Sequence, residues 1–142
     1  MTAASNTLRI EMPSLPPAEY SSNNSRGKSY WVKQKITSLA HDEIIAAVLE
    51  QGWKGEPLEN AVVKVSFGLP DRRKRDYNSL IERFKPWQDA LTRNPDKNGI
   101  WRGAGVLWDD DLDTIGWPMF SHFLSPKNPV TIIEVEGSND GN

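Results

Sequence analysis

The sequence contains no cysteine among its 142 residues. Disulfide bridges and thiolate metal sites are therefore excluded. Its two histidines, His41 and His122, lie far apart in the chain, and neither stands at a spacing typical of metal ligands. A metal ion bound to this chain would have to be held by oxygen atoms.

Long apolar runs are also lacking. No stretch approaches the ~20 consecutive apolar residues that cross a bilayer. The first residues do not show the charged-then-apolar pattern of a secretory signal. The sequence therefore predicts a cytoplasmic protein with no membrane partner.

The composition is that of an ordinary folded protein, with 37% hydrophobic and 25% charged residues. The length is enough for one hydrophobic core and too short for two. We expect a single domain over residues 1–136. The polar segment 137–142 is expected to be a disordered tail.

The charges are unevenly distributed, although the formal net charge is only −2. Basic residues fill positions 72–75 and form a second group between 26 and 35, whereas acidic residues gather at 109–113. The local field can therefore be positive enough to attract phosphate groups. The predicted DNA-binding residues are Arg26, Lys28, Lys33, Lys35, Arg72, Arg73, Lys74 and Arg75.

Hydrophobic periodicity predicts alternating strands and helices. Spacings of two residues indicate strands, and spacings of three and four indicate helices. The order βαβαββ indicates an α/β (α+β) fold, with one mixed β-sheet and two helices packed on it. Strands are expected at 7–12, 61–69, 112–123 and 130–135, and helices at 30–51 and about 80–91.

Several local signals refine these elements. Ser79 followed by Glu82 is a capping-box pattern, so Ser79 is expected to cap a second helix that begins at Leu80. Pro86 lacks a backbone donor and is expected to kink this helix or restart it. Aromatic side chains are expected to pack in the core. They are Tyr30, Trp31, Trp87, Trp108 and Trp117.

Two acidic positions are candidates for chemistry. Asp76 ends the basic run, and a second group, Asp109 to Asp111, follows a short apolar stretch. Two carboxylate sites that share metal ions can activate water and stabilise the leaving oxygen of a phosphoryl displacement. Alternatively, Asp76 caps a helix and the acidic triplet is a solvated turn. Asp111 and Asp113 are expected in turns or on the surface.

A set of motifs in this order resembles the RusA family of Holliday junction resolvases. The matching features are a Pro-Asp-Arg-Arg run after a strand, an aspartate, a lysine four residues before Asp-Ala-Leu, and a glycine leading through apolar residues to Asp-Asp. The resemblance covers most of the chain. Its residues are Pro70 to Arg75, Asp76, Lys85, Asp89 to Leu91, and Gly105 to Asp110.

The resemblance implies a set of catalytic residues. These would be Asp76, Asn78, Lys85 and Asp110, and three of them, Asp76, Asn78 and Asp110, would bind Mg²⁺ or Mn²⁺. Asn78 stands where the family has aspartate. Because an amide brings no charge, it would bind a hard cation more weakly. A slip of one residue would exchange Asp110 with Asp109.

The implied function is metal-dependent endonucleolytic cleavage of branched DNA in recombination and repair. A four-way junction has two-fold symmetry, so a homodimer is expected to cut its two opposed strands. The alternative is a catalytically weakened protein that binds structured DNA without cutting it. A structural protein that does not bind nucleic acid is hard to reconcile with the basic run at 72–75.

Overall fold

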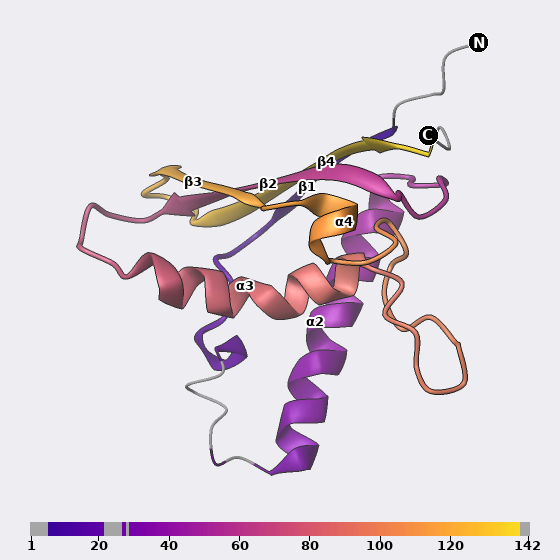
Figure 1. Cartoon of the computed structure of the whole chain (residues 1–142). Helices are drawn as coiled ribbons and strands as arrows, with labels where there is room; N and C mark the ends of the chain where they lie inside the picture. Colours follow the sequence, from indigo (N-terminus) through magenta and orange to yellow (C-terminus); the bar gives the residue numbers. More distant parts are fainter. Residues whose placement is uncertain (1–5, 22–26, 28, 140–142) are drawn as a thin grey trace.

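One mixed sheet of four strands carries its helices on a single face (Figure 1). The computed structural model describes residues 6–21, 27 and 29–139. The predicted α/β (α+β) class and the order βαβαββ are confirmed, with two short helices added. The elements are β1 (Asn6–Met12), η1 (Ala18–Tyr20), α2 (Tyr30–Glu50), β2 (Asn60–Leu69), α3 (Tyr77–Leu91), α4 (Leu112–Ile115), β3 (Met119–Leu124) and β4 (Val130–Ser138).

The strand order in the sheet is β1-β4-β2-β3. β4 runs antiparallel to both β1 and β2, whereas β3 runs parallel to β2 at the edge. A parallel pair needs a long crossover connection, because the chain must return to the starting end of the sheet. Here α3, the following loop and α4 make that return, so they lie beside the β2–β3 half of the sheet.

The core lies between the sheet and the helices. Alternate residues of each long strand are buried, which explains the two-residue periodicity of the sequence. The Phe84 side chain of α3 is fully buried and meets the rings of Phe67 and Phe120 edge-on, with centroids 6.4 and 6.0 Å away. The largest fully buried side chains include Ile10, Ile44, Leu58, Phe84, Trp87, Leu91, Leu107 and Ile133.

Helix α3 differs from the prediction at two points. It begins three residues earlier than expected, because the Asp76 carboxylate caps it by accepting the Asn78 N–H at 3.0 Å. Ser79 therefore lies inside the helix. Pro86 is also inside it and does not end it. The buried side chains of Phe84 and Trp87 on either side hold the helix together where the proline donor is missing.

The predicted strand at 112–123 is partly wrong. Its first residues form α4, which begins because the Asp111 carboxylate accepts the Thr114 N–H at 2.9 Å. The helix ends at Gly116, whose φ of 61° favours glycine. The edge strand β3 then starts only at Met119.

The predicted disordered tail is wrong at its start, because β4 continues to Ser138. Gly137 pairs with Asn6 on one side and with Ala61 on the other. A Cβ atom at Gly137 would lie 2.2 Å from the Asn60 carbonyl oxygen, so only glycine fits at this point of the ladder. Residues 140–142 lie outside the described residues.

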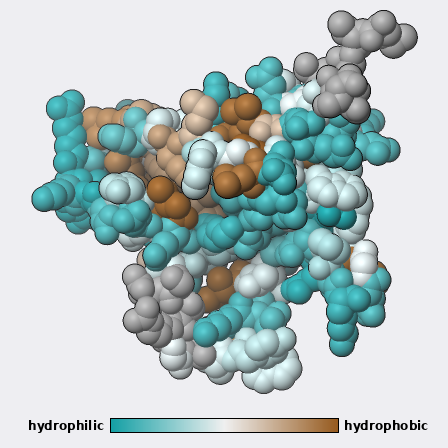
Figure 2. Space-filling view, viewed as in Figure 1, coloured by the Kyte–Doolittle hydropathy of each residue, from teal (hydrophilic) through white to brown (hydrophobic). Residues whose placement is uncertain are grey.

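Several aromatic side chains expected in the core are exposed instead. Tyr30 and Trp31 lie at the start of α2, in the half of the helix that projects away from the sheet (Figure 1). Trp87 is fully buried as predicted, but Trp117 is 82% exposed. Apolar side chains gather on the surface over β3 and α4 (Figure 2). Within the described ranges, no helix has the length and hydrophobicity to cross a membrane.

Replacing Phe84 should destabilise the fold strongly. Phe84→Ala removes the ring that joins α3 to β2 and β3, so the free energy of unfolding should fall by about 3–5 kcal/mol. Phe84→Leu, which keeps most of the buried apolar volume, should cost roughly half as much. Urea denaturation followed by circular dichroism measures both. Equal, small losses for the two variants would show that this contact does not anchor α3.

Candidate active site

The segment before the acidic triplet is fixed by buried backbone. Val106 and Leu107 are fully buried between the end of α3 and the chain around Leu58. The Leu58 N–H donates to the Val106 carbonyl at 2.8 Å, and the Trp108 N–H donates to the Leu58 carbonyl at 2.9 Å. The Leu107 N–H donates to the Leu91 carbonyl at 3.0 Å. These bonds bring Asp109 and Asp110 back beside α3.

Two further contacts hold this segment in place. The Arg93 Nε–H donates to the Trp108 carbonyl at 2.8 Å, and its guanidinium lies 3.5 Å from the centre of the Trp108 ring. A Cβ atom at Gly103 would lie 2.0 Å from the Thr92 carbonyl oxygen. Glycine is therefore needed where the loop after α3 turns back against the helix end.

A lysine and two aspartates meet on the exposed side of α3, and we call them the Lys85 cluster. The Lys85 Nζ donates to Asp110 Oδ2 at 2.8 Å and lies 3.4 Å from Asp89 Oδ1. Asp89 and Asp110 therefore share Lys85 as a common partner. The Asp110 N–H donates to Asp109 Oδ1 at 2.8 Å, so Asp109 turns toward its own backbone.

The three groups of the Lys85 cluster shift one another's pKa values. Burial raises the pKa of Asp89 to about 6, and its hydrogen bond with Asp110 acts in the same direction. Burial also pushes the pKa of Asp110 upward, but hydrogen bonds from Lys85 and Asp89 outweigh it and hold that pKa below its ordinary value. The cluster thus holds an ionised Asp110 beside a carboxyl whose pKa is raised.

The structure brings together Lys85 and Asp110 and leaves Asp76 and Asn78 elsewhere. Asp76 caps the first turn of α3, nine residues before Lys85, which corresponds to about 13 Å along a helix axis. Asn78 is about 10 Å away by the same measure. Among the described residues, Asp76 and Asn78 form no hydrogen bond or ion pair with the three side chains of the Lys85 cluster. The structure agrees with the alternative prediction, in which Asp76 caps a helix.

The basic run forms an ordered loop between β2 and α3. Asp71 organises it, because its carboxylate accepts the Arg73 N–H at 2.9 Å and pairs with the Arg75 guanidinium at 3.0 Å. The backbone hydrogen bond to Arg73, followed by the side-chain bond to Arg75, lowers the pKa of Asp71. Arg72, Arg73 and Lys74 are exposed. This loop leads into the first turn of α3, whereas Lys85 lies in the middle of the helix and Asp89 in its last turns.

The second basic group lies on and before α2. Lys33 and Lys85 line one cavity of about 400 Å³ between α2 and α3. Lys35 is exposed on α2. Arg26 and Lys28 lie outside the described residues.

The Lys85 ammonium pairs with both carboxyl groups of the Lys85 cluster. Among residues 6–21, 27 and 29–139, no group of three acidic or histidine side chains is placed to hold a metal ion. Asp89 and Asp110 nevertheless supply two adjacent carboxyl groups. Mg²⁺ commonly binds through one or two carboxylates, with water and substrate phosphate completing its shell.

Comparisons with known proteins add no assignment: no family model and no curated protein matches this chain.

Asp89 and Asp71 stand at sequence spacings from which their contacts could have been predicted. Asp89 follows Lys85 by four residues, the spacing of an ion pair on one face of a helix. Asp71 directly precedes the basic run, where an aspartate commonly bonds the backbone N–H two residues later. Neither signal alone shows that Asp89 also meets Asp110, which is 21 residues further along the chain.

Asp89→Asn should change stability in a pH-dependent way. The folded-state pKa of about 6 lies above the ordinary value of 3.8, so wild-type stability falls as pH rises through this window. Asparagine keeps a donor for Asp110 and carries no charge. Because Asp89 is 43% exposed and screened by solvent, the variant should gain only about 1 kcal/mol on the wild type between pH 4 and pH 7.

Urea titrations of both proteins across this pH range measure the difference. Asp113→Asn, at an exposed position of α4, is the matched control and should follow the wild type at every pH. A constant offset between Asp89→Asn and wild type would contradict the raised pKa.

Proposed function

We propose that the protein is a metal-dependent endonuclease that acts on branched DNA. The observation that carries the proposal is the direct contact of Lys85 with Asp110 at 2.8 Å, across 25 residues of sequence. These are two of the four residues that the resemblance to RusA resolvases implies for catalysis. A second carboxyl, Asp89, lies in the same cluster, and burial raises its pKa.

The proposed catalytic set is Lys85, Asp89 and Asp110. Asp89 replaces Asp76 and Asn78 as the partner of Asp110, since it lies in the same cluster. Bound Mg²⁺ or Mn²⁺ would supply the Lewis acid for phosphoryl displacement. Asp110 and Asp89 would hold the ion. The Lys85 ammonium pairs with both carboxyl groups, and with an ion bound it would supply a positive charge for a substrate phosphate.

The basic residues would bind the DNA backbone on both sides of this cluster. The loop at 72–75 lies at one end of α3, and Lys33 lines the cavity that Lys85 also lines. Each phosphate contact releases counterions and positions the duplex without reading its sequence. A homodimer is proposed on symmetry grounds, because two related sites match the two opposed strands of a junction.

The second candidate is a protein that binds structured DNA without cutting it. The observation that favours it is the distance of Asp76 and Asn78 from Asp110, which leaves two carboxyl groups at the cluster instead of a larger ligand set. Lys85 already pairs with both of them. Under this candidate the cluster is a structural ion-pair network and the basic loop carries the function.

Cleavage assays separate these candidates. The wild type should cut a synthetic four-way junction when Mg²⁺ or Mn²⁺ is present. Asp110→Asn and Asp89→Asn should each reduce cleavage by at least about a hundredfold, because each removes a metal carboxylate. Junction binding, measured in EDTA by gel shift, should persist in both variants.

Two control variants make this test specific. Asp113→Asn, an exposed acid near Asp110 in sequence, should cut like the wild type. Asn78→Asp should leave the metal titration unchanged, since Asn78 lies outside the cluster. A lower metal requirement in Asn78→Asp would restore Asn78 to the ion site. No cleavage by the wild type with either ion would favour the binding-only candidate.

The basic loop gives a separate prediction on binding. Arg72→Ala combined with Arg73→Ala should weaken junction binding and reduce the slope of log affinity against log salt by about two, one for each phosphate contact. Arg75 is left in place because it holds the loop through Asp71. Lys54→Ala, in the connection between α2 and β2, should keep the full slope. An unchanged slope in the double variant would exclude the loop from the DNA interface.

A further inference from the structure

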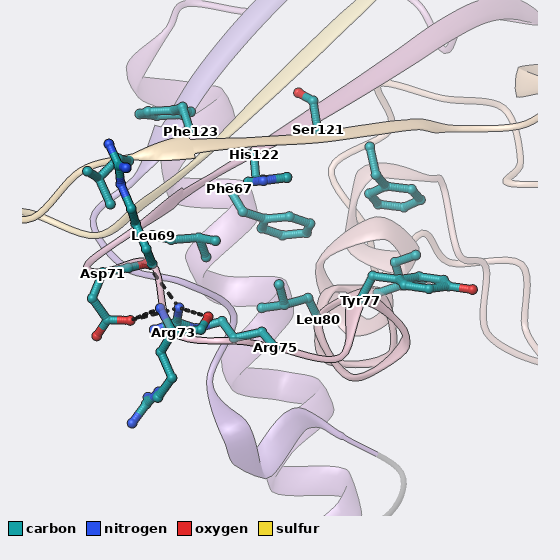
Figure 3. Close-up of a pocket in the computed structure, with 14 residues that line it drawn as sticks. Phe67, Leu69, Asp71, Arg73, Arg75, Tyr77, Leu80, Ser121, His122 and Phe123 are labelled. Carbon is teal, nitrogen blue, oxygen red and sulfur yellow. Dashed lines mark hydrogen bonds and ion pairs between the residues drawn. The ribbon is translucent and has the colours of Figure 1, made fainter.

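A second site lies at the other end of α3, away from the Lys85 cluster. It is a cavity of about 670 Å³ between the β2–β3 edge of the sheet and the first turns of α3, bordered by the basic loop (Figure 3). Lys85, Asp89 and Asp110 do not line it. Its volume lies within the range of small-molecule sites, about 300–1,000 Å³. We call it the aromatic cavity.

The walls of the aromatic cavity suit a flat, apolar group. Phe67 and Phe120 lie nearly parallel, with ring planes 3° apart, and form part of its wall. Phe67, Leu80 and His122 point into the space between the sheet and the helix (Figure 3). Leu69 of β2, Leu124 of β3, and Tyr77 and Ile81 of α3 also line the cavity.

The mouth of the cavity also offers groups that form hydrogen bonds. Tyr77 is 71% exposed at the start of α3, and His122 is exposed on the edge strand β3. A ligand in the cavity can therefore meet an imidazole and apolar surface together. Purine and pyrimidine bases carry ring nitrogens and oxygens around a flat face, which matches this combination.

One end of the cavity is strongly cationic. Arg72, Arg73 and Arg75 line it together with Asp71. Arg75 is occupied by Asp71, but in the described part of the chain Arg72 and Arg73 form no ion pair. A phosphate group at this end would meet guanidinium donors, which bind phosphate in a bidentate manner.

We propose that the aromatic cavity binds one unstacked nucleotide of the DNA substrate. Its base lies between β3 and α3, and its phosphate contacts the basic loop at 72–75. The proposal rests on the proposed function only for the source of the nucleotide, which is the branched DNA. Extracting a base costs a few kcal/mol in a duplex and less where pairing is already lost, as beside a branch point.

The experiment compares junctions that carry a base or an abasic site at one position, scanned around the branch point. Binding is measured in EDTA by fluorescence anisotropy, so that no cleavage occurs. At one position the abasic junction should bind the wild type about tenfold more weakly, because the stacked base is missing. Leu124→Trp, which fills the cavity mouth, should abolish this difference, and Tyr77→Ala should reduce it.

Trp117→Ala is the matched control. Trp117 is an exposed aromatic residue just before β3 that does not line the cavity, so the variant should keep the full difference. Equal affinity of the wild type for base-bearing and abasic junctions at every position would overturn the proposal. So would a change of oligomeric state in Leu124→Trp by analytical ultracentrifugation, because a second copy of the chain would then occupy the cavity.

Free ligands distinguish the source of the nucleotide. Wild-type titrations with deoxyadenosine monophosphate and with inorganic phosphate, followed by NMR, should give weak binding of the nucleotide at the cavity and weaker binding of phosphate. If the free nucleotide binds with micromolar affinity while base-bearing and abasic junctions bind equally well, DNA is not the source of the bound nucleotide. A base preference in a protein that never cuts DNA would support the cavity and refute the nuclease.

Discussion

The edge-on packing of Phe84 against Phe67 and Phe120 fixes helix α3 beneath the β2–β3 half of the sheet. Every candidate functional group depends on that placement. The first turns of α3 face the aromatic cavity, and its later turns present Lys85 and Asp89 to Asp110. Because a packed aromatic contact has few alternative arrangements, the two sites sit on one rigid element and keep a fixed separation.

Local periodicity was enough to predict the sheet-and-helix order, because burial of alternate strand residues and of one helix face leaves a direct trace in the sequence. Periodicity did not predict the boundaries of elements that depend on a single side-chain hydrogen bond. Asp76 and Asp111 each start a helix by accepting one N–H, and so shift the expected boundaries of α3 and the edge strand. The end of β4 depends on room for Gly137 between two neighbouring strands, which no local pattern reveals.

The candidate site was predictable only in part for the same reason. The family resemblance implied that Lys85 and Asp110 act together, and they are in contact. The same resemblance grouped Asp76 and Asn78 with them. A continuous helix from Tyr77 past Pro86 separates them from the cluster, and proline made that continuity hard to foresee. Asp89 was visible as a helical neighbour of Lys85, but its link to Asp110 depends on the buried segment Val106–Leu107.

The two proposed sites are linked by the length of α3. From the turn at Tyr77–Ile81, which faces the aromatic cavity, to the turn at Lys85–Asp89 the axial distance is about 12 Å. One strand of B-form DNA advances about 3.4 Å per nucleotide. A strand that follows α3 would therefore place its unstacked nucleotide about three or four nucleotides from the phosphate at the Lys85 cluster. One helix would then fix the spacing between the recognised base and the cleaved phosphate. No conformational change would be needed to couple recognition to cleavage.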